Sequence, residues 1–119
     1  MNKTVLIVLT SLLWATSAFA VDISETIKSL DGKELVDRDG KPLNYTFDAV
    51  IQSALYNEPS SSEDEKGKNY RLAVKAQTQA KDFNPSPDEI IRIRKALAAT
   101  QPTLIFGLVM SRIDPSFGK

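Results

Sequence analysis

The stretch Ser86–Leu97, SPDEIIRIRKAL, decides the fold class. Ser86 is a good N-cap residue, Pro87 suits the first helical position, and Glu89 completes a capping box. Apolar residues then recur on one face of a helix: Ile90, Ile93 and Leu97. These signals together predict a helix with a buried stripe, and they favour a mainly α-helical fold around it.

The segment from residue 46 to residue 57 carries a second helix signal. Thr46 can cap the helix, and Asp48 in the first turn is favoured by the positive end of the helix dipole. Apolar residues follow at i, i+3, i+4, i+7 and i+8: Phe47, Val50, Ile51, Ala54 and Leu55. We therefore expect a helix that buries this face.

A further helix is expected between these two segments. Ser62 and Glu65 form a capping box, but Gly67 is unfavourable inside a helix, so the helix is expected to be regular only from about Lys68. Its apolar stripe is thin: Tyr70, Ala73, Val74, Ala76, Gln77 and Ala80. Such a stripe predicts a helix that packs on one side only.

Residues 103–113, TLIFGLVMSRI, are apolar on nearly every side until Arg112. A helix that is apolar all round is a buried one, so we interpret this segment as the central core helix. Gly107 is expected where another helix approaches closely, because a mid-helix glycine is otherwise unfavourable. Leu108 is expected to be buried. A β-strand over Leu104–Met110 is the alternative, because the run is short and partly β-branched.

Two Asp-Gly-Lys units precede the helices, Asp31-Gly32-Lys33 and Asp39-Gly40-Lys41. Asp-Gly between short apolar segments indicates a tight turn, because glycine tolerates positive φ. The first unit is expected to join Ile27–Leu30 to Glu34–Val36 in a small hairpin. The predicted fold is thus mainly α, with a small N-terminal β-hairpin followed by a compact bundle of about four short helices.

The first 20 residues are interpreted as a secretory signal peptide. Lys3 supplies a basic start, an uncharged apolar run follows, and Ala18-Phe19-Ala20 fits the small-x-small cleavage pattern. The strongly apolar part, Val5–Trp14, is about half as long as a membrane span. Cleavage after Ala20 predicts a periplasmic or secreted bacterial protein that begins at Val21 and has no stable membrane span. The alternatives are an uncleaved anchor and a misassigned start codon.

The predicted organisation of the chain has four parts. Residues 1–20 are the signal peptide, residues 21–26 a polar lead-in, residues 27–114 a single globular domain, and residues 115–119 a disordered tail. A chain of about 100 residues can build one modest hydrophobic core. One domain is therefore expected after cleavage.

The chain contains no histidine and no cysteine. Disulfides, thiolate nucleophiles and serine–histidine catalysis are thereby excluded. Residues 35–46 invite comparison with a calcium-binding loop, but Leu35 and Thr46 stand where the first aspartate and the bidentate glutamate belong. We expect no metal, no cofactor and no catalytic residues. A hydrolase that uses paired carboxylates or a serine–lysine pair is the enzymatic alternative.

Charge is balanced, with 15 basic and 15 acidic residues. This balance gives no indication of binding to nucleic acid. The one compact basic group consists of Arg92, Arg94 and Lys95, and no aromatic residues are interleaved with it. We expect it to be a solvated helix face. The alternative is a docking surface for an acidic partner.

A Leu-Asp-Gly-Lys opening in LDGKELVDRDGKPLNYTFDAVIQSAL is followed by NYRLAVKAQ, SPDEIIRIRKAL and QPTLIFGLV, and these motifs span most of the chain after the signal. In these motifs the chain resembles a loose group of small phage- and prophage-encoded proteins, which end on an apolar helix. The resemblance implies neither an activity nor site residues. The members of that group look cytoplasmic, whereas this chain carries an export signal.

These observations predict a non-enzymatic protein that acts by protein–protein interaction in the bacterial envelope. By analogy with prophage proteins, its role would be superinfection exclusion or modulation of lysis, and its partner an envelope or phage protein. The alternative is a cytoplasmic phage assembly or virion accessory protein. That alternative requires that residues 1–20 are not a working signal.

Overall fold

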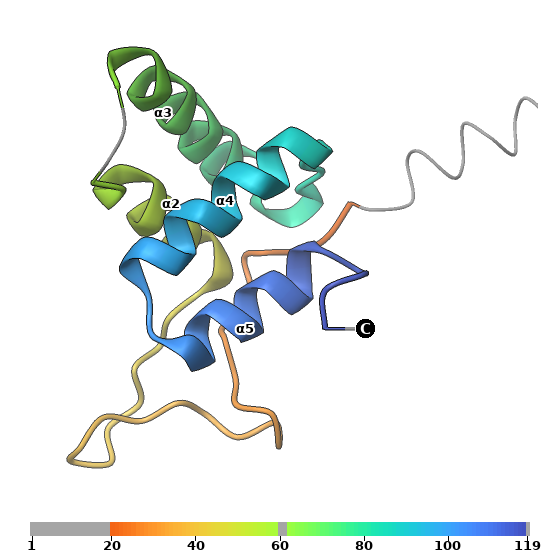
Figure 1. Cartoon of the computed structure of the whole chain (residues 1–119). Helices are drawn as coiled ribbons and strands as arrows, with labels where there is room; N and C mark the ends of the chain where they lie inside the picture. The colour runs from red at the N-terminus through yellow and green to blue at the C-terminus, as the bar shows by residue number, and fades with distance from the viewer. Residues whose placement is uncertain (1–19, 60–61, 119) are drawn as a thin grey trace, which may run out of the picture.

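The computed structural model describes residues 20–59 and 62–118. Within them the chain forms α2 (Phe47–Asn57), α3 (Glu63–Thr78), the 3₁₀ turn η1 (Ala80–Asp82), α4 (Pro87–Thr100) and α5 (Thr103–Ile113). The prediction of a mainly α-helical fold is confirmed (Figure 1). The predicted signal peptide, including Ala18 of its cleavage motif, lies outside the described residues, apart from Ala20.

Helix α2 is the centre of the helical body. It packs against both α3 and α4, and α5 packs along α4 (Figure 1). The hydroxyl of Thr46 caps α2 by accepting a hydrogen bond from Ala49 N at 3.4 Å. The apolar face predicted for this helix is buried throughout: Phe47, Val50, Ile51, Ala54 and Leu55. The spacing of these residues therefore predicts correctly which face of α2 is buried.

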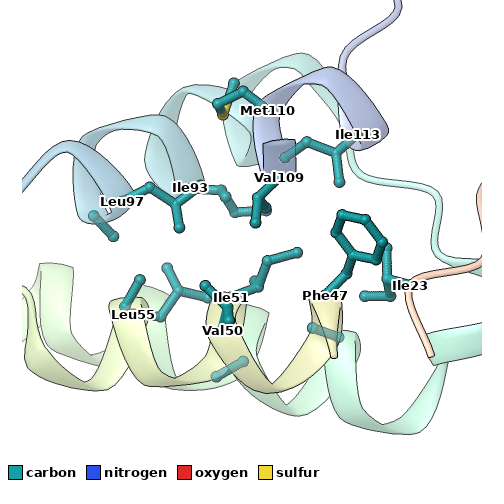
Figure 2. Packing of buried hydrophobic residues seen from close by; sticks show 14 of the residues in the cluster. Ile23, Phe47, Val50, Ile51, Leu55, Ile93, Leu97, Val109, Met110 and Ile113 are labelled. Carbon is teal, nitrogen blue, oxygen red and sulfur yellow. The ribbon is translucent and has the colours of Figure 1, made fainter. Parts of the chain in front are cut away.

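Helix α4 covers the buried face of α2. Figure 2 shows Ile93 and Leu97 of α4 directed toward Ile51 and Leu55 of α2. Both α4 side chains are fully buried, at 0% exposure. The core is therefore built mainly where two predicted amphipathic faces meet.

The start of α4 follows from its local sequence, as predicted. Ser86 Oγ accepts a hydrogen bond from Glu89 N at 3.2 Å, and Glu89 Oε1 accepts one from Ser86 N at 2.8 Å. Pro87 occupies the first helical position, where its missing N–H leaves no donor unsatisfied. The capping box is thus confirmed.

Helix α3 begins earlier than predicted, at Glu63, directly after its cap Ser62. Gly67 does not delay it, because the cap and the acidic first turn stabilise the start. The buried face also differs from the predicted stripe: it consists of Asn69, Leu72, Ala73 and Ala76. Tyr70, which was expected in the stripe, is 61% exposed. The face that meets α2 thus leaves Tyr70 on the solvent side.

Residues 103–113 form helix α5, so the alternative of a β-strand is wrong. The interpretation of α5 as the central helix is also wrong, because Leu104 is 48% exposed and Leu108 is only half-buried. A Cβ on Gly107 would meet no described atom within 4 Å, so the expected close helix approach is not there. The buried face consists of Ile105, Val109, Met110 and Ile113. Helix α5 lies against α4 on this face and leaves its outer face open.

The lead-in before residue 27 is bound into the body rather than free. Val21 N donates to Phe83 O at 2.8 Å, and Phe83 N donates to Val21 O at 2.9 Å. Ile23 is fully buried, at 0% exposure, and its N–H donates to Ala80 O at 2.7 Å. The globular body therefore starts at residue 21, not at residue 27.

The segment after α5 also contacts the body. Phe117, which lies in the tail predicted to be disordered, is half-buried. Its ring meets Phe106 of α5 edge-on, with the ring centroids 5.7 Å apart. This contact extends the body beyond residue 114.

Residues 28–43 project from the helices and hold the two predicted Asp-Gly turns; we call them the turn arm (Figure 1). No strand forms in the described part of the chain. The predicted hairpin corresponds to a single antiparallel bridge between Lys28 and Glu34, and another joins Val36 to Pro42. The turns are therefore held locally rather than by a sheet.

Candidate interaction surface

Helices α3 and α4 line a charged groove of about 690 Å³. Lys75 Nζ on α3 donates to Glu89 Oε1 on α4 at 2.7 Å. Arg92 pairs with Glu65, and its Nη1 also donates to Oδ1 of the buried Asn69 at 3.0 Å. Opposite charges therefore already neutralise one another across this groove.

The predicted basic group does not form one surface. Successive helical residues are rotated by about 100°, so Arg92 and Arg94 leave α4 in nearly opposite directions. Arg94 pairs with Asp114 at 3.4 Å and lines a separate, apolar groove. Lys95 is exposed and lines the α3–α4 groove together with Arg92. The structure thus brings Arg92 and Lys95 together and separates Arg94 from them.

Two carboxylates of the α3–α4 groove, those of Glu65 and Glu89, are held ionised. A hydrogen bond from Arg92 lowers the pKa of Glu65. Partial burial disfavours the ionised form of Glu89, but hydrogen bonds from Lys75 and Ser86 outweigh this effect and lower its pKa. A general acid at neutral pH needs a raised pKa instead. These carboxylates therefore join the two helices rather than offer a proton.

For the other polar groups of the described residues, the relevant requirements are those of a metal site and those of a buried charge. Within residues 20–59 and 62–118, no three or more metal-ligating acidic side chains lie together. Asp48 Oδ1 is buried with no hydrogen-bond partner in this part of the chain, and its place in the first turn of α2 exposes it to the positive end of the helix dipole. In the same residues, no helix is both long and apolar enough to cross a membrane.

A hollow of about 510 Å³ lies between the turn arm and α5; we call it the arm hollow. Leu30 from the arm, Phe47 from α2 and Leu108 from α5 line it. The guanidinium of Arg112 lies 4.5 Å from the Phe47 ring centre and 3.2 Å from Glu25 Oε1. Leu30 is 88% exposed although it is apolar. The arm hollow thus combines a free apolar side chain with a fixed cation and anion.

The outer face of α5 continues the arm hollow. Leu104 and Leu108 lie four residues apart and therefore share one side of the helix, and Leu104 is 48% exposed. On the arm itself, Val36 is 53% exposed. This region of the described surface is consequently the candidate binding site for a partner.

The sequence pattern does not predict the arm hollow. Leu30 was expected in a hairpin strand, whereas it lies inside the turn that Gly32 closes. The position directly before Asp-Gly is the signal that could have placed this side chain in solvent. The pairing of the arm with α5 has no signal in the sequence, because it joins residues about 80 positions apart.

No protein-family model, curated protein or solved structure matches this chain. The resemblance to phage-encoded proteins therefore rests on the sequence motifs alone. The function is inferred from the residues and the geometry described above.

Proposed function

We propose that this chain is an exported, non-enzymatic protein that acts by binding another protein in the bacterial envelope. The observation that carries the proposal is the arm hollow, where Leu30 is 88% exposed beside Phe47 and Leu108. Burial of apolar surface is the main favourable contribution to protein association. The arm hollow offers such surface to a partner.

The position of Leu30 strengthens this argument. Single exposed apolar residues are common and need no explanation. Leu30, however, stands at the second position of a tight turn, which accepts most residue types, so the fold itself does not require leucine there. Contact with a partner accounts for an apolar residue at this position.

Binding is a better proposal than catalysis because many of the described acidic groups have local structural roles. Several aspartates accept hydrogen bonds from residues two or four positions away in the chain: Asp22, Asp31, Asp37 and Asp114. Glu65 and Glu89 join α3 to α4. The pKa values of Glu65 and Glu89 are lowered, whereas an acid catalyst needs a raised pKa.

Export is supported by the place where the body begins. Ala20 is exposed, and Val21 is already bonded to Phe83 through both its N–H and its C=O. A cut between Ala20 and Val21 would therefore leave the backbone pairing of Val21 with Phe83 intact. The envelope roles suggested by the phage resemblance, superinfection exclusion and modulation of lysis, are part of this proposal.

The test is crosslinking of the purified protein in a periplasmic extract, with the crosslinked partner identified by mass spectrometry. Leu30→Ser should abolish the specific crosslink without lowering the melting temperature, because Leu30 is 88% exposed. Tyr70→Ser is the matched control: it changes a side chain that is 61% exposed on α3, away from the arm hollow. If Leu30→Ser crosslinks like the wild type, the arm hollow is not the binding surface.

The second candidate is a cytoplasmic phage assembly or virion accessory protein, as the phage resemblance suggests. It predicts that the chain stays in the cytoplasm with residues 1–20 attached. The location and the N-terminus of the expressed protein separate the two functions. An intact Met1 in the cytosol favours the assembly protein.

A further inference from the structure

The two turns of the arm are copies of one motif, SLDGK at residues 29–33 and DRDGK at residues 37–41. The N–H of the first motif residue donates to the C=O of the fifth: Ser29 N to Lys33 O at 2.8 Å, and Asp37 N to Lys41 O at 2.9 Å. The glycine N–H donates to the C=O of the first motif residue: Gly32 N to Ser29 O at 2.9 Å, and Gly40 N to Asp37 O at 3.1 Å. Gly32 and Gly40 have φ of 82° and 79°. Each is therefore a tight turn closed by a left-handed glycine, a common hairpin connection.

The two turns differ in the carboxylate that holds them. In the first turn, Asp31 itself accepts hydrogen bonds from the Ser29 hydroxyl and, at 3.2 Å, from Lys33 N. In the second turn, the carboxylate of Asp37 does this work by accepting from Asp39 N at 2.8 Å and from Lys41 N at 3.0 Å.

This difference concerns the two aspartates that precede glycine. The Asp31 carboxylate is tied into its turn by the Ser29 hydroxyl and the Lys33 amide. The Asp39 carboxylate accepts no hydrogen bond from any residue in the described part of the chain. Both aspartates are exposed.

An aspartate before glycine can rearrange without an enzyme. The glycine N attacks the aspartate Cγ, an N–Cγ bond forms, and the carboxyl C–OH bond breaks, so that one water leaves with the amide proton. The resulting five-membered imide is opened by water at either carbonyl. Opening at one carbonyl returns aspartate, and opening at the other gives isoaspartate, in which the backbone runs through the side chain. Glycine favours the reaction because no Cβ hinders the attacking nitrogen.

We propose that Asp39-Gly40 is a site of spontaneous isoaspartate formation and that it reacts severalfold faster than Asp31-Gly32. The reaction requires a carboxyl group that is neutral and free to rotate onto the glycine N. Reaction at Asp39 requires only that the hydrogen bond from Gly40 N to Asp37 O breaks. At Asp31 the carboxylate must in addition lose its hydrogen bonds from the Ser29 hydroxyl and from Lys33 N. Hydrogen bonds from Ser29 and Lys33 also lower the pKa of Asp31, which makes its neutral form rarer.

Isoaspartate at residue 39 would change the shape of the turn arm. The modified residue adds one carbon to the backbone, so the Asp37–Lys41 pair cannot keep its present register. Val36, which is 53% exposed, lies directly before this turn. If the arm binds a partner as proposed above, the modification alters that surface with time; the modification itself does not depend on that function.

The test is incubation of the folded protein in H₂¹⁸O at neutral pH, followed by digestion in ordinary water with a protease that cuts after glutamate. Cuts after Glu25, Glu34 and Glu58 place Asp31 and Asp39 on different peptides. Each imide that opens incorporates one ¹⁸O. We expect severalfold more label and isoaspartate at Asp39 than at Asp31. Equal labelling, or more at Asp31, would overturn the proposal.

Two exchanges of the first turn residue sharpen this test. Asp37→Ser gives the second turn the Ser-x-Asp-Gly-Lys sequence of the first, so labelling at Asp39 should slow. Ser29→Asp gives the first turn the sequence type of the second, so labelling at Asp31 should accelerate. Asp39→Ser should remove the label that residue 39 contributes to its peptide. Labelling rates that do not change with these exchanges would show that turn sequence, and hence the described hydrogen bonding, does not control the reaction.

Discussion

Helices α2 and α5 are each 11 residues long, and they show what places a helix in this fold. Helix α5 is apolar on nearly every side, yet it lies against α4 with its outer face open. Helix α2 has a polar side, yet it packs against both α3 and α4. Five of its apolar residues form one stripe, and all five are buried. In this fold, a helix with one apolar stripe and a polar opposite face lies at the centre, and the helix with the higher total apolar content does not.

The largest effect should follow truncation in the centre of α2. Ile51→Ala removes a fully buried side chain, at 0% exposure, and leaves a cavity facing α4. We expect a loss of about 2–5 kcal/mol of unfolding free energy, which is a large share of a small domain's stability. Chemical denaturation followed by circular dichroism measures it. A variant as stable as the wild type would show that this side chain of α2 is not part of the core.

Truncation on α5 should cost less, although this helix is the more apolar. Leu108 is half-buried and lines the open arm hollow, so Leu108→Ala should lose about 1 kcal/mol. The same denaturation experiment compares it with Ile51→Ala. If the α5 variant is the less stable of the two, then α5 is the central helix and the comparison is reversed.

The contact between α3 and α4 should give an acid-sensitive contribution. The pKa of Glu89 is lowered in the fold, so its contribution to stability is present above the unfolded pKa and is lost as the pH falls through the folded pKa. We expect Glu89→Gln, which can still complete the capping box, to flatten the fall in stability between about pH 5 and pH 3. Melting temperatures across this range measure it.

The control for this variant is Glu34→Gln, because Glu34 is exposed, lies outside the helices and makes no ion pair with any described residue. It should keep the acid response of the wild type. An unchanged response in Glu89→Gln would mean that the Lys75–Glu89 pair does not contribute to stability.

The smallest effect is expected at the edge of the basic group. Arg94 pairs with Asp114, but half of its side chain, 50%, is exposed. Exposed ion pairs contribute little, so Arg94→Ala should change the unfolding free energy by less than about 0.5 kcal/mol. A loss above about 1 kcal/mol of unfolding free energy would show that the Arg94–Asp114 pair contributes more to stability than an exposed ion pair normally does.

Local features of the fold could be predicted from the sequence. The caps at Thr46, Ser62 and Ser86 each act on the amide three residues away, so their signals lie within one short window. The stripes of α2 and α4 follow from the helical period for the same reason. The separation of Arg92 from Arg94 also follows from that period.

Other features depend on which elements meet in space. The outer position of α5 is set by long-range packing, which no short window of sequence predicts. The burial of Ile23 is of this kind too, because it depends on backbone pairing between Val21 and Phe83. The candidate surface was missed for this reason: it joins the arm, α2 and α5.

In the proposed function the chain is exported and its mature form begins at Val21. The intact mass of the protein recovered from the periplasm of an expressing bacterium measures where that form begins. We predict the mass of the chain that starts at Val21, the residue at which backbone pairing with Phe83 begins. Recovery of the full chain from Met1, confined to the cytoplasm, would contradict the account.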